Sequence, residues 1–342
     1  MFLVVRILVT VGLVVGLCVM LGPDNLKKLP DHVAHADIGL LALAFVALIA
    51  GTLCGSLRWW LLLRRLGVHM NLRRAVFFFF MGYFFNNLLP SSVGGDAVKA
   101  YYVVRASGKK REPIASVIMD RGFGMAALIC VAGLATVLAP PSMQLVGVKT
   151  TLGIVAIVAI VLIALVAVEP VTERTLMPIL RLLHQEWRGR RFFRLVRGCL
   201  RPSDTSGGAL LLSFCAWQTT ILMFYFVCRS VVGPVPIGYF YLFVPLVALV
   251  STLPVTIAGI GLAEMSIVGL FKILEGIGEA DAMAAALLAR AVMIAGALLG
   301  WIVFAFKDDL GLGHLPGLGE LKRMEASGGD APAEPAAADG ED

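Results

Sequence analysis

The chain has 342 residues, of which 59% are hydrophobic and only 15% carry a charge. Because soluble domains are about one-quarter charged, this composition excludes a soluble protein and indicates an integral membrane protein. The six cysteines are scattered without a Cys-x-x-Cys or Cys/His cluster, so we expect no disulfide framework, no metal site and no cofactor.

Apolar segments long enough to cross a bilayer, about 20 residues each, cover most of the chain up to residue 306. The first of them, near the N-terminus, is long for a secretion signal and lacks a cleavage site of small residues, so we expect it to be retained. We predict an all-α polytopic membrane protein with about six full spans, at residues 2–21, 38–57, 114–139, 150–168, 208–228 and 281–306.

Two further apolar regions, 75–104 and 237–271, are each interrupted by a segment rich in proline or glycine. Both segments begin with Leu-Pro, at Pro90 and Pro254, continue into glycines and end in a helical pattern that carries a charge. Hydrocarbon offers no water to unpaired N–H and C=O groups, so two broken membrane helices indicate a use for the breaks. We predict two broken helical hairpins, and the sequence leaves open whether they are re-entrant or fully spanning.

Lysine and arginine are concentrated in three loops, which extend from Arg58 to Arg74, from Arg105 to Arg111 and from Arg174 to Arg201. Positively charged loops stay in the cytoplasm, so we place these three loops and both termini there. The first hairpin then enters from the cytoplasmic face and the second from the opposite face. Because the basic loops are tethered between spans, we expect no nucleic acid partner.

Each hairpin is followed by a long span with an arginine in its first half, Arg121 after the first and Arg290 after the second. Two such units in opposite orientation are typical of an inverted-topology repeat, whose substrate site lies near the midplane between broken helices. We predict a first repeat at about 38–139 and a second at about 208–306. Between them lies a basic cytoplasmic loop, 169–207, and its residues 174–201 are expected to form an amphipathic helix on anionic lipid.

Ionisable residues inside the predicted membrane segments are the main candidates for a site, because each costs about 2.5–3.5 kcal/mol near the bilayer centre. They must be paired or line a wet cavity. By symmetry between the repeats, we predict that Asp96 pairs with Arg121 and Glu264 with Arg290. One interpretation is structural: the pairs only pin the two hairpins to the bundle.

The functional interpretation is a polar groove for a lipid headgroup. Backbone N–H groups at a helix start bind phosphate readily, and serine hydroxyls and arginines would add to such a site. The predicted substrate-binding residues are Asn87, Pro90, Ser91, Ser92, Gly94, Gly95, Asp96, Lys99, Asp120, Arg121, Pro254, Gly259, Gly261, Glu264 and Arg290. We assign no catalytic residue.

Three stretches carry a recognisable motif: Asn87 to Lys99, Ser116 to Arg121, and Pro254 to Glu264. They resemble the motifs of the lysylphosphatidylglycerol synthase transmembrane-region family, which includes the flippase domain of the multiple peptide resistance factor and many stand-alone membrane proteins. The resemblance covers about residues 1–310. Lys99 departs from the arginine expected at its position, which keeps the positive charge but loses bidentate phosphate binding.

The resemblance implies a flippase-like domain at 1–310 in the bacterial inner membrane, multi-pass with both termini cytoplasmic. It does not imply aminoacyl-lipid synthesis, which belongs to a separate soluble domain. The remaining residues, 311–342, are expected to be a cytoplasmic tail whose composition predicts disorder from about 326. We therefore expect lipid translocation rather than enzymatic bond chemistry.

Several alternatives stay open at this point. The lipid partner could be an anionic or aminoacylated phospholipid, an isoprenoid or a glycolipid carrier, and a separate lipid synthase and a homodimer are further candidate partners. Other functions are a non-transporting accessory subunit of a lipid-modifying or glycosyltransferase system, and an intramembrane lipid-modifying enzyme.

Overall fold

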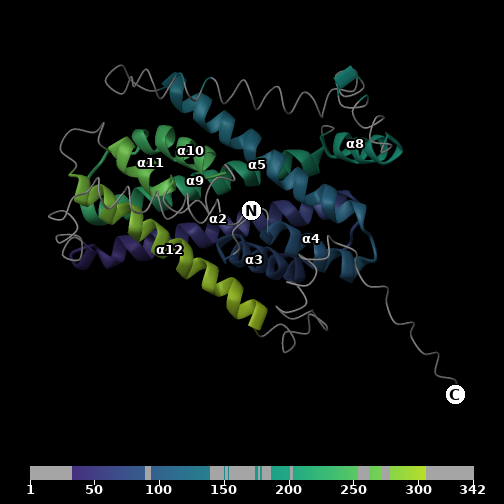
Figure 1. The fold of residues 1–342 in the computed structure, drawn as a ribbon, viewed down its shortest axis with the longest axis horizontal. Helices are drawn as coiled ribbons and strands as arrows, with labels where there is room; N and C mark the ends of the chain where they lie inside the picture. Colours follow the sequence, from purple (N-terminus) through teal and green to yellow (C-terminus); the bar gives the residue numbers. More distant parts are fainter. Residues whose placement is uncertain are drawn as a thin grey trace, which may run out of the picture. The chain divides into compact units, whose positions relative to one another are not determined.

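The computed structural model describes residues 33–88, 94–138, 186–200, 203–252, 262–271 and 278–305, together with a few isolated positions between 150 and 178. Regular structure in these residues is entirely helical (Figure 1). The helices are α2 (Ile38–Arg65), α3 (Leu72–Leu88), α4 (Gly94–Ser107), α5 (Arg111–Leu138), α8 (Glu186–Leu200), α9 (Asp204–Val232), α10 (Gly238–Thr252), α11 (Leu262–Phe271) and α12 (Glu279–Ala305).

Four of these helices are long and apolar enough to cross a membrane: α2, α5, α9 and residues Glu279–Ile302 of α12. Helices of 24 to 29 residues are about 36–44 Å long, which exceeds the hydrocarbon thickness of a bilayer. The prediction of a helical, multi-pass membrane protein is confirmed. The predicted span at 2–21, nearly all of that at 150–168, and the tail at 311–342 lie outside the described residues.

The first proline-glycine segment separates two helices that pack on each other, α3 and α4. They have 17 and 14 residues, and glycines bring their backbones together. A Cβ atom at Gly95 would collide with the carbonyl oxygen of Gly82 and with Asn86. The Gly95 N–H donates to Asn86 Oδ1 at 2.9 Å, so the end of α3 caps the start of α4.

Gly95→Ala is expected to destabilise the protein by about 1–3 kcal/mol, because the added methyl group overpacks the contact between α3 and α4. The measurement is thermal unfolding of the purified protein in detergent. Gly133→Ala is the matched control, since a Cβ atom at Gly133 in α5 meets nothing within 4 Å. Equal unfolding temperatures for the two variants would contradict the close approach of these helices.

The second segment also separates two packed helices, α10 and α11, of 15 and 10 residues. The central residues of both segments, 89–93 and 253–261, lie outside the described residues. Each segment is thus flanked by two short helices that pack on each other, and we call these pairs the first hairpin (α3 and α4) and the second hairpin (α10 and α11).

The basic loops meet at one end of the helices. Lys109 Nζ donates to the carbonyl of Gly67 at 2.7 Å, which joins the loop after α4 to the loop after α2. The Arg65 guanidinium donates to the Gly198 carbonyl of α8 and to the Ser203 hydroxyl before α9. The end of α2, the open end of the first hairpin, the end of α8 and the start of α9 therefore lie together.

The opposite end is held by the start of α2 and the end of α9. The Asp37 N–H donates to the Ser230 carbonyl at 3.0 Å, and α2 and α9 make extensive contact with each other. A short link containing Gly233, with a φ of 88°, leads from α9 into α10. The second hairpin therefore begins at the end opposite to that of the first.

The predicted amphipathic helix of the basic loop is α8. Its residues Val196 and Cys199 are buried in a cluster with Leu62, Met119, Phe123 and Ala209 of the bundle. Burial raises the pKa of the Cys199 thiol, as expected for a cysteine that packs as a small apolar side chain. The expectation that the apolar face of this helix rests on lipid is wrong for these residues, because the bundle already covers them.

Candidate functional site

Five charged side chains gather where α5 packs against α2 and α4. Asp96 and Lys99 lie one turn apart on α4, Asp120 and Arg121 are adjacent on α5, and Arg58 comes from α2. Placing charges on helices with so few polar residues is costly, so the sequence must supply partners for each of them. The packing of these three helices brings those partners within contact distance.

Asp96 binds two cations, one with each carboxylate oxygen. Arg121 donates from Nε and Nη2 to Asp96 Oδ2, both at 2.6 Å. Lys99 Nζ lies 2.8 Å from Asp96 Oδ1. The predicted pair of Asp96 with Arg121 is confirmed, and Lys99 joins it as a second cation.

Lys99 is the centre of the network and is only 3% exposed. Its ammonium group lies 3.6 Å from Asp120 Oδ2 and faces the rings of Trp59 and Phe79, at 5.2 and 4.4 Å from their centroids. Cation–π contacts of this kind gain strength where water is excluded. A lysine so enclosed acts as an internal counter-ion, and the bidentate geometry that it lacks is not used at this position.

Arg58 closes the inner end of the network. Its Nε donates to Asp120 Oδ1 at 2.7 Å and its Nη1 donates to the Ser213 hydroxyl of α9 at 3.1 Å. The five side chains thus form one chain of contacts in the order Arg121, Asp96, Lys99, Asp120, Arg58. The sequence analysis counted Arg58 as a loop charge, which is wrong: α2 continues to Arg65, and Arg58 is 9% exposed within it.

Arg121 differs from the other four members in its exposure. Its side chain is 46% exposed, whereas those of Asp96 and Lys99 are 4% exposed and those of Arg58 and Asp120 are 10% and 7% exposed. The network therefore has a dry interior and one accessible end. A ligand that approaches it meets the guanidinium of Arg121 first.

A simpler ion pair joins α11 and α12. Arg290 of α12 donates from Nε and Nη2 to Glu264 Oε1 of α11, both at 2.8 Å, with side-chain exposures of 18% and 7%. This confirms the second predicted pair. On α3, Asn87 Nδ2 donates to the Tyr83 carbonyl at 2.9 Å, and a Cβ atom at Gly296 of α12 would lie 3.7 Å from the Tyr83 ring. The helix that carries Asn87 therefore packs against α12, the helix that carries Arg290.

The other predicted site residues have separate outcomes. Gly94 and Gly95 start α4, but the Gly95 N–H already donates to Asn86, so a phosphate there would have to displace that amide. Pro90, Ser91, Ser92, Pro254, Gly259 and Gly261 lie outside the described residues. The sequence analysis missed Arg58 and Ser213; the apolar residues that follow Arg58 inside the same helix were the available signal.

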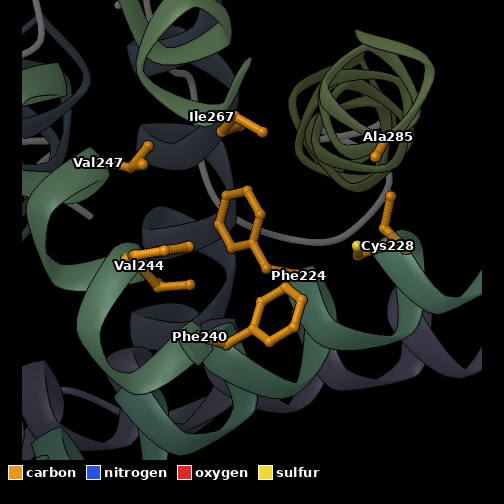
Figure 2. A pocket seen from close by; sticks show the side chains of 9 residues that line it. Phe224, Cys228, Phe240, Val244, Val247, Ile267 and Ala285 are labelled. Carbon is orange, nitrogen blue, oxygen red and sulfur yellow. The ribbon is translucent and has the colours of Figure 1, made fainter. Parts of the chain in front are cut away.

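An apolar pocket lies among α9, α10, α11 and α12 (Figure 2). Figure 2 shows the rings of Phe224 and Phe240 within it. The lining residues are Phe224, Val227, Cys228, Phe240, Phe243, Val244, Val247, Ile267 and Ala285. The described side chains around this pocket are apolar, so this part of the pocket is suited to hydrocarbon.

Comparison with known proteins identifies the family of the chain. The family model of the lysylphosphatidylglycerol synthase TM region matches residues 3–300, which is most of the chain. No curated protein and no solved structure matches the chain. The match includes both hairpins, the charge network and the Glu264–Arg290 pair. The chain therefore belongs to the family of the lysylphosphatidylglycerol synthase transmembrane region.

Proposed function

We propose that this protein moves a lipid across the bacterial inner membrane and binds the lipid headgroup at the Arg121 end of the charge network. The observation that carries the proposal is the contrast in exposure within that network. Four ionised side chains are buried, and one arginine, 46% exposed, is accessible. A chain that only needed to pin its helices would gain more from apolar side chains of similar volume.

The arrangement of the hairpins supports a translocation mechanism. The first hairpin opens at the end where α2 stops, and the second begins at the end where α2 starts. Each hairpin contributes an acid, Asp96 or Glu264, to an arginine on the span that follows it. Two related units of opposite orientation are the architecture of alternating-access transporters, in which one unit rocks against the other around a shared site.

The proposed orientation follows from the basic end of the helices. The loop after α2, the loop after α4 and the end of α8 meet there, and positively charged loops remain on the cytoplasmic side. Translocation requires no bond chemistry from this chain. A separate lipid synthase would supply an aminoacylated substrate, and a homodimer stays a prediction.

The test is lipid movement in proteoliposomes that contain fluorescent phosphatidylglycerol, with dithionite quenching as the readout of the exposed leaflet. Arg121→Ala is expected to slow lipid movement at least about tenfold, because a charge-assisted hydrogen bond contributes about 1.5–3 kcal/mol. Asp96→Asn is expected to slow it as well. Arg105→Gln removes an exposed charge from the same hairpin and is the control.

Two results would oppose the proposal. If Arg121→Ala moved lipid at the parent's rate, the headgroup would not bind at Arg121. No lipid movement by the parent would favour the accessory subunit, since binding and assembly could then continue without transport.

A further inference from the structure

The five side chains of the charge network do not balance in charge among themselves. Arg58, Lys99 and Arg121 are positive, whereas Asp96 and Asp120 are negative, so these five side chains carry one net positive charge. The Glu264–Arg290 pair of the second repeat contains one charge of each sign. The two repeats therefore differ in what they can offer to a charged ligand.

The surplus positive charge can be presented to a ligand only at one end of the network. Arg58 is held by Asp120 and Ser213 in the interior. Lys99 is enclosed by two carboxylates and two aromatic rings. Arg121 alone among the five has an accessible side chain, with 46% exposure.

Asp96 can release Arg121 without becoming an unpaired buried charge. Removing the partner of a buried carboxylate is strongly unfavourable when nothing replaces it. Here Lys99 Nζ stays 2.8 Å from Oδ1 while Arg121 occupies only Oδ2. The two cations use different oxygens, so one can leave while the other remains.

We infer that Lys99 is a resident counter-ion that frees Arg121 to exchange Asp96 for the phosphate of a lipid headgroup. This inference rests on the proposed function and specifies its substrate class: a lipid with a singly charged phosphodiester, which balances the one surplus charge of the network. Arg121 then provides the fork geometry that suits a phosphate, and Lys99 supplies the compensating point charge inside. Asp96 takes Arg121 back when the lipid leaves.

The test is native mass spectrometry of the full chain in detergent, titrated with phosphatidylglycerol. Lys99→Gln is expected to reduce the affinity at least about tenfold, because Arg121 is then needed to neutralise Asp96. Lys99→Gln combined with Asp96→Asn restores the net positive charge and is expected to recover most of that affinity. Arg105→Gln, outside the network, should bind phosphatidylglycerol as the parent does. Diacylglycerol, which has no phosphate, should bind equally to the parent and to Lys99→Gln.

The recovery by the second substitution separates charge balance from folding. A merely structural Lys99 would make the double variant bind no better than Lys99→Gln, and that result would overturn the inference. Binding by Lys99→Gln at the parent's affinity would overturn it too. Displacement of phosphatidylglycerol by an equal concentration of inorganic phosphate would contradict a lipid source for the anion.

The same measurement distinguishes this inference from the proposed function. Asp96→Asn alone is expected to bind phosphatidylglycerol at least as well as the parent but to fail to move it. The variant lacks the carboxylate with which Arg121 pairs again when the lipid leaves. If the parent binds in a Lys99-dependent manner but moves no lipid, the inference survives and the transport function fails.

Discussion

Arg58→Met is expected to lower the free energy of unfolding by about 3 kcal/mol, at the lower end of the cost of breaking a buried ion pair. The substitution keeps most of the apolar volume and leaves Asp120, 5% exposed, without the guanidinium 2.7 Å away. Lys99 moderates the loss, since its ammonium group is already 3.6 Å from the other Asp120 oxygen. The measurement is chemical or thermal unfolding in detergent.

The partner substitution and a surface control complete this experiment. Arg58→Met with Asp120→Leu should recover much of the lost stability, because well-packed apolar residues replace a buried pair at little cost. Arg64→Met removes an exposed arginine that lies over the Trp60 ring of the same helix, and should cost less than about 1 kcal/mol. Equal losses for Arg58→Met and Arg64→Met would contradict the buried position of Arg58.

Loss of Arg58 also has a consequence for the accessible end of the network. Asp120 would then draw Lys99 toward itself and away from Asp96, since Lys99 is the cation that the two carboxylates share. Asp96 would in turn hold Arg121 more tightly. Arg58→Met is therefore expected to weaken lipid binding at Arg121 in addition to lowering stability.

The two ion pairs could be predicted from sequence because symmetry restricts the choices. Asp96 and Arg121 stand in one hairpin-and-span unit, Glu264 and Arg290 in the other, and an unpaired charge in hydrocarbon is too costly to keep. The length of the apolar segments predicted the helical class and four of the spans, because a long apolar segment leaves few alternatives.

The inner part of the network could not be predicted, because counting charges assigns each arginine to the nearest loop. Arg58 is followed by two tryptophans and three leucines before the helix ends with Arg64 and Arg65, and only packing shows that its guanidinium points into the bundle. The position of the Lys99 ammonium near the rings of Trp59 and Phe79 depends on three helices at once. No local sequence pattern encodes such a contact.

The Glu264–Arg290 pair between α11 and α12 allows a structural role to be distinguished from a role in transport. Arg290→Ala is expected to cost about 3–5 kcal/mol of stability, because it breaks the 2.8 Å pair with Glu264, which is only 7% exposed. Glu264→Gln with Arg290→Gln should recover most of this loss, since two neutral amides replace the two charges. Both effects are measured by unfolding in detergent.

Lipid movement by the two variants then separates the interpretations. If the pair only pins α11 to α12, the double variant regains transport together with stability. If the pair is a working counterpart of Asp96 and Arg121, the double variant is stable and still moves lipid at least about tenfold more slowly than the parent, the effect of losing one charge-assisted contact. We expect the second result, because α12, which carries Arg290, packs closely on α3 of the first hairpin, with Gly296 beside Tyr83 and Gly300 beside Phe80. A double variant as active as the parent would restrict the site to the first repeat.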